Sequence, residues 1–68
     1  MSVFEEMLDL NKEYLWCFDH YDVEKMKEMS QTMAKMYKVW ARKLGISWVK
    51  VENLCMMMRT DLRVNGGI

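Results

Sequence analysis

The sequence has no proline, three glycines and one histidine, and these absences limit what the chain can do. Proline and glycine interrupt helices, so their scarcity favours long, uninterrupted helices. A single histidine, His20, cannot supply a histidine-based metal site or a catalytic triad, because the chain offers it few partners. There is also no glycine-rich phosphate loop and no nucleophile elbow. We therefore expect no enzymatic activity, no catalytic residue, no metal site and no cofactor.

The two cysteines, Cys17 and Cys55, are far apart, and each lies within an apolar helical pattern. Neither has a second cysteine or histidine at metal-ligand spacing. This pattern favours two buried thiols in a reducing compartment. The first ten residues carry acids where a signal peptide carries positive charge, and no apolar run approaches the ~20 residues that span a bilayer. We predict a soluble, cytoplasmic protein that does not contact a membrane.

The abundant residues, among them methionine, lysine, glutamate and leucine, predict an all-α chain. We expect a single domain over residues 1–68, built as a small three-helix bundle. The helical patterns cover residues 2–18, 23–44 and 47–62, and residues 64–68 are expected to form a frayed tail.

The boundaries of these helices follow from capping residues. Ser2, with Glu5 three residues later, has the spacing of a capping box. Asp22 and Ser47 are expected to cap the second and third helices. Gly45 ends the second helix, because glycine readily adopts the left-handed conformation that follows a helix.

Each helical pattern carries an apolar face. In the first helix this face comprises Phe4, Met7, Leu8, Leu15 and Phe18. In the third it comprises Val51, Leu54, Cys55, Met58 and Leu62. The second helix has a methionine stripe, formed by Met26, Met29, Met33, Met36 and Trp40. We expect the methionine stripe to pack within the bundle core, and a homodimer through this stripe is the alternative.

Charge is divided between the two halves of the sequence. Residues 1–34 contain eight acids and three lysines, whereas residues 35–68 contain seven bases and two acids. The halves therefore carry formal charges of −5 and +5 in a chain of zero net charge. Such asymmetry indicates an electrostatic partner for one half, or mutual neutralisation of the halves within the fold or a dimer.

The stretch ARKLGISWVKVENL resembles the motif of the helix-turn-helix superfamily. That motif has a small residue in its first helix, a Leu-Gly-hydrophobic-Ser turn and inward apolar residues in its second helix. The matching positions are Ala41, Leu44, Gly45, Ile46, Ser47, Val51 and Leu54. The resemblance covers about a fifth of the chain and implies a helix-turn-helix formed by the second and third helices.

The resemblance also implies that the third helix enters the major groove of double-stranded DNA, in a regulatory protein that is dimeric. With Val51 and Leu54 inward, the predicted base-reading surface comprises Val49, Asn53, Met56 and Thr60. Ser47 is a further predicted DNA-binding residue. The predicted phosphate contacts are Arg42, Lys43, Lys50, Arg59 and Arg63.

The same surface supports a second interpretation. No arginine or lysine lies at the centre of the outward face, and Glu52 would approach the phosphates. Exposed methionines form adaptable surfaces that suit protein partners. The alternative function is therefore a small inhibitor or adaptor, of the kind that phage or mobile-element genomes encode, that binds a larger protein. Its predicted contact residues are Trp48, Val49, Met56 and Met57.

Overall fold

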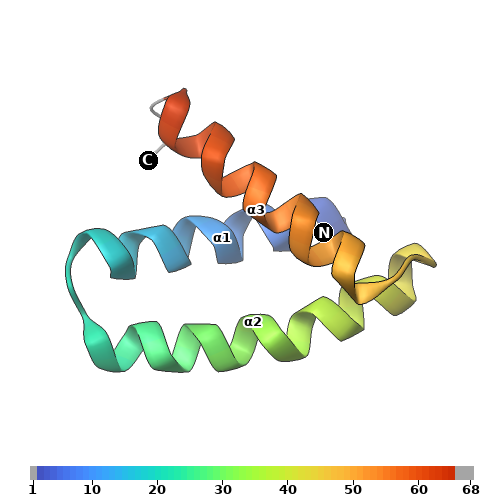
Figure 1. The fold of residues 1–68 in the computed structure, drawn as a ribbon, viewed down its shortest axis with the longest axis horizontal. Coiled ribbons are helices and arrows are strands. Elements are labelled where there is room, and N and C mark those ends of the chain that lie inside the picture. Colours follow the sequence, from blue (N-terminus) through green and yellow to red (C-terminus); the bar gives the residue numbers. More distant parts are fainter. Residues whose placement is uncertain (1, 66–68) are drawn as a thin grey trace.

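The computed structural model describes residues 2–65, which form three helices joined by two short turns (Figure 1). The helices are α1 (Val3–Asp19), α2 (Val23–Leu44) and α3 (Trp48–Val64). These bounds confirm the predicted all-α bundle. None of the three helices combines the length and apolarity needed to cross a membrane.

Side-chain caps fix where each helix begins. A capping oxygen satisfies a backbone N–H that has no partner inside the helix. The caps are Ser2, Asp22 and Ser47, which accept hydrogen bonds from the backbone N–H groups of Glu5, Lys25 and Lys50 at 3.2, 3.1 and 3.3 Å. All three predicted caps are therefore confirmed.

Gly45 ends α2 in the left-handed conformation, with φ 69° and ψ 32°. The backbone N–H of Ile46 then donates to the carbonyl of Ala41 at 3.1 Å. This bond satisfies a carbonyl at the end of α2 and turns the chain toward α3. The turn that the sequence predicts at this glycine is confirmed.

We expect Gly45→Ala to lower the free energy of unfolding by about 1–2 kcal/mol, because a Cβ is unfavourable in the left-handed conformation. No atom lies within 4 Å of the position that the Cβ would take, so the loss arises from the backbone alone. Gly45→Asn is the control and should lose less, since asparagine tolerates this conformation. Urea denaturation measures both losses. Equal stability of Gly45→Ala and the wild type would contradict this account of the turn.

Helices α1 and α2 run antiparallel, and α3 crosses them obliquely (Figure 1). Each helix contacts both of the others. The core lies where the three helices meet and comprises Met7, Met33, Trp40, Ala41, Val51 and Cys55. The methionine stripe thus packs inside the chain at Met33 and Trp40, as we expected. A homodimer through the half-buried members of the stripe stays a prediction.

The predicted inward face of α1 is wrong at Phe4 and Phe18, which are both about half exposed. Phe4 is the second residue of α1 and Phe18 is the next to last, so both lie toward the ends of the helix. A polar residue, Asn11, is instead fully buried at the middle of α1. The buried residues of α1 are therefore Met7, Asn11, Leu15 and Cys17.

The predicted frayed tail begins too early. Val64 is the last residue of α3, and the backbone N–H of Asn65 donates to the carbonyl of Asp61 at 2.9 Å. Helix α3 therefore continues for two residues beyond Leu62, the last residue of the apolar pattern. The rest of the predicted tail, residues 66–68, lies outside the described residues.

Candidate protein-interaction surface

The three helices present outer surfaces of different chemistry. The exposed outer residues of α1 include the acids Glu5, Asp9 and Glu13. The exposed outer residues in the second half of α2 are the bases Lys35, Lys38 and Arg42. The outer face of α3 carries no charge, and its six exposed residues are Val49, Asn53, Met56, Met57, Thr60 and Val64.

The outer face of α3 is unusual because it exposes large apolar side chains. Met56 and Met57 are 51% and 63% exposed, and Val49 and Val64 are also exposed. A helix that packs on a bundle through one face ordinarily has polar or charged residues on the opposite face. Here charges stand only at the two edges of the outer face, so its centre is open to an apolar partner.

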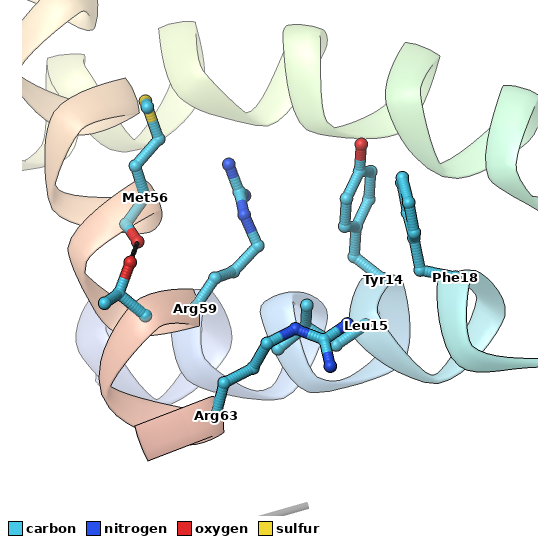
Figure 2. Close-up of a pocket in the computed structure, with 7 residues that line it drawn as sticks. Tyr14, Leu15, Phe18, Met56, Arg59 and Arg63 are labelled. Carbon is cyan, nitrogen blue, oxygen red and sulfur yellow. Dashed lines mark hydrogen bonds between the residues drawn. The ribbon is translucent and has the colours of Figure 1, made fainter.

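A groove of about 330 Å³ lies between the second half of α3 and the second half of α1 (Figure 2). Helix α1 contributes Tyr14, Leu15 and Phe18, and α3 contributes Met56, Arg59, Thr60 and Arg63. The rings of Tyr14 and Phe18 lie 5.9 Å apart in a tilted arrangement. The groove therefore combines exposed aromatic surface with two guanidinium groups.

A buried hydrogen-bond network holds Arg59 at the edge of this groove. Arg59 Nη1 donates to Asn11 Oδ1 at 2.7 Å, and Asn11 Nδ2 donates to the carbonyl of Met7 at 2.7 Å. The guanidinium carbon of Arg59 also lies 5.1 Å from the centre of the Tyr14 ring, at cation–π distance. Arg59 is thereby fixed against α1, and Figure 2 shows its side chain between the α3 ribbon and Tyr14.

The same network borders Cys55, whose pKa is raised above its ordinary value. Burial is the main cause, because it disfavours the charged thiolate. A hydrogen bond with Asn11 and the positive charge of Arg59 act in the opposite direction. Cys55 is free and buried, as is Cys17, so both thiols are placed as the sequence predicted.

The predicted phosphate contacts divide into two groups. Arg63 Nη2 donates to Asp19 Oδ1 at 2.8 Å, so this arginine, like Arg59, is directed toward α1. Lys43 lies 3.8 Å from Glu6, a longer ion pair. Arg42 and Lys50 are exposed and form no ion pair within residues 2–65. Only the second group is fully available to an external anion.

The residues predicted to read bases, or to bind a protein, lie mostly together. Val49, Asn53, Met56 and Thr60 all belong to the outer face of α3, and Ser47 is exposed at its start. Trp48 is exposed as well, but it borders a separate hollow beside Lys38 and Arg42 at the turn. Trp48 and the methionine pair therefore do not form one continuous site.

Sequence reasoning missed Asn11, Tyr14 and Phe18 as parts of a site. A sequence signal for Asn11 did exist, because this amide interrupts the apolar face of α1 between Met7 and Leu15. A buried amide needs hydrogen-bond partners, and Arg59 provides one. No sequence signal identified the groove, since it depends on how far α3 diverges from α1.

Within residues 2–65, no group of three or more histidine, cysteine, aspartate or glutamate side chains is placed to hold a metal ion. Comparisons of the chain with protein-family models, with curated proteins and with solved structures find no match.

Proposed function

We propose that this chain is a protein-interaction module whose contact surface is the outer face of α3. The observation that carries the proposal is the set of exposed, uncharged side chains on this face between Val49 and Val64, which includes Met56 and Met57. Covering apolar surface is favourable by roughly 25 cal/mol per Å². Methionine side chains adapt to the shape of a partner, which suits a small inhibitor or adaptor.

The surroundings of this face favour a protein over DNA as the partner. Helices that read bases usually place arginine or lysine side chains against base edges in the major groove. Here Arg59 and Arg63 both contact α1, through Asn11 and Asp19. The centre of the face offers only Asn53 and Thr60 as side-chain hydrogen-bonding groups.

The proposal is tested with the double variant Met56→Ser/Met57→Ser. Affinity capture from cells that express the protein, followed by quantitative mass spectrometry, compares it with the wild type. The control is Val23→Ser, which changes an equally exposed apolar residue on another helix, at the start of α2. We expect the double variant to recover at least about tenfold less of the specific partner than the wild type does. A tenfold loss of affinity corresponds to ~1.4 kcal/mol of binding free energy. Equal recovery by the double variant and the wild type would contradict the proposal.

A second candidate function is DNA binding, in line with the helix-turn-helix resemblance. It is favoured by four exposed bases on α2 and at the start of α3, namely Lys35, Lys38, Arg42 and Lys50. None of them forms an ion pair within the part of the chain that the structure describes. In this candidate the bases contact phosphates, and the protein regulates transcription or another DNA transaction.

Fluorescence anisotropy with a random duplex of about two helical turns tests this second candidate. Binding through phosphates should weaken steeply between roughly 50 and 200 mM salt, because neutralised phosphates release counterions. The variant Lys38→Gln/Arg42→Gln should bind more weakly than Lys27→Gln, a control lysine in the first half of α2. No binding at low salt by the folded protein would exclude this candidate. For either function, a reducing cytoplasm is the compartment that two free, buried thiols suit best.

A further inference from the structure

We infer that the partner of the outer face of α3 is a second copy of this chain, with the two α3 helices antiparallel about a two-fold axis. The inference rests on the proposed function, because it takes this face to be an interface. It places the dimer contact on α3, whereas the alternative drawn from the sequence used the methionine stripe of α2. In that stripe, Met33 and Trp40 are buried in the core and Met36 packs against it.

The first support is the order of residues along the outer face. Counted outward from the Met56–Met57 pair, Asn53 mirrors Thr60, and Val49 mirrors Val64. An antiparallel two-fold pair sets each position against its mirror position in the other copy. Methionine then meets methionine, polar meets polar and valine meets valine. A face of this kind is complementary to itself, which a closed two-fold interface requires.

The second support is the charge at the two edges of the face. Lys50 and Asp61 lie along one edge, and Glu52 and Arg63 lie along the other. In an antiparallel two-fold pair, each edge runs beside the same edge of the other copy in the reverse direction. Lys50 therefore lies beside Asp61 of the second copy, and Glu52 lies beside Arg63 of the second copy. Exact register would set Lys50 opposite position 63 and Glu52 opposite position 61 of the second copy. Asp61 and Arg63 therefore each lie about two residues from the exactly opposite position, or about 3 Å at 1.5 Å per residue.

These edge charges are available for such contacts. Lys50, Glu52 and Asp61 form no ion pair within residues 2–65. Arg63 has its ion pair with Asp19 and remains about half exposed, so further guanidinium donors stay free. Exposed ion pairs add little stability, but opposite charges at both edges select the register and disfavour shifted ones.

Dimerisation would also determine which other surfaces of the chain stay exposed. Two copies paired through α3 leave the basic residues of each α2 exposed, with two sets of Lys35, Lys38 and Arg42 in one particle. The base-reading use of Asn53 and Met56 would be excluded, because the second copy covers them. Met56 and Thr60 also line the groove shown in Figure 2, so the second copy would cover part of each groove.

Sedimentation velocity of the purified full chain over a wide concentration range tests the inference. A single helix face is a small interface, so we expect a reversible shift from the 8.2 kDa monomer toward twice that mass. Met57→Lys buries two lysines near the two-fold axis and should raise the dissociation constant at least tenfold. Lys35→Met, on the outer surface of α2, should leave the dissociation constant unchanged. Circular dichroism verifies that each variant is folded.

A charge exchange tests the antiparallel register separately. Lys50→Glu places glutamate beside Asp61 of the second copy and should weaken the dimer several-fold. The double variant Lys50→Glu/Asp61→Lys restores opposite charges and should recover wild-type affinity. A double variant no stronger than Lys50→Glu alone would overturn the antiparallel register. A folded wild type that stays monomeric at every concentration would overturn the second copy as partner.

The two proposals fail in distinguishable ways. If the wild type is monomeric but Met56→Ser/Met57→Ser still abolishes capture of a cellular protein, the interaction face stands and the second copy is wrong. If neither self-association nor capture depends on Met56 and Met57, the proposed function itself is wrong.

Discussion

Trp40→Ala is expected to remove a large share of the free energy of unfolding of this chain, about 3–5 kcal/mol. Trp40 is fully buried at the centre of the core, among residues from all three helices. Removing a buried aromatic side chain costs about 3–5 kcal/mol through lost burial and the remaining cavity. A domain of this length has a total stability of only roughly 3–10 kcal/mol. Circular dichroism with a urea titration measures the loss, and a loss below about 1 kcal/mol would contradict this account of the core.

Trp40→Phe is the informative companion variant. The indole Nε1 of Trp40 is buried and has no hydrogen-bond partner among the described residues. An unpaired buried donor costs about 1–3 kcal/mol, and phenylalanine removes that cost while keeping most of the ring. We therefore expect Trp40→Phe to lose less than about 1.5 kcal/mol. A loss as large as that of Trp40→Ala would show that the N–H group has a partner after all.

Arg59→Met is expected to lower the free energy of unfolding by about 1–3 kcal/mol. Methionine keeps much of the apolar length of the side chain but cannot donate to Asn11 Oδ1, which accepts from Arg59 at 2.7 Å. Because Asn11 is fully buried, its oxygen would then lack a partner. The variant also loses the cation–π contact with Tyr14.

A double variant isolates the hydrogen bond from the other losses. Asn11→Leu/Arg59→Met has neither the unpaired amide nor the guanidinium and should be more stable than Arg59→Met alone. Urea denaturation of the wild type, of Asn11→Leu, of Arg59→Met and of the double variant gives the coupling energy between the two residues. Additive losses would contradict a direct Asn11–Arg59 interaction.

The sequence was a good guide to the boundaries of the helices because these depend on local chemistry. Ser2, Asp22 and Ser47 each act through a backbone N–H three residues away, and Gly45 acts through its own backbone. Such contacts join residues that are close together in the sequence, so the sequence alone predicts them. The same holds for the inward residues of α3, where helical periodicity alone identifies the buried ones.

The interior of α1 was harder to predict because it depends on tertiary geometry. Apolar spacing favoured Phe4 and Phe18, yet both are about half exposed, and the polar Asn11 is fully buried instead. The burial of Asn11 follows from a partner 48 positions away, Arg59. Periodicity describes one helix at a time and carries no information on where two helices cross.

The candidate site was likewise predictable from the sequence only in part. Exposure of Met56 and Met57 follows from their angular position opposite Val51, so the sequence was sufficient. The sequence could not show that Arg59 and Arg63 turn toward Asn11 and Asp19. Both lie at the edge of the outward face, where a side chain can follow either the solvent or the neighbouring helix.

The central claim is that the outer face of α3 is where this chain meets another protein chain. Amide chemical shifts of the ¹⁵N-labelled protein, recorded over a dilution series, test it most directly. We expect concentration-dependent shifts gathered on α3, at Val49, Asn53, Met56, Met57, Thr60 and Val64. Shifts gathered instead on the methionine stripe of α2, or around Lys35, Lys38 and Arg42, would contradict the claim.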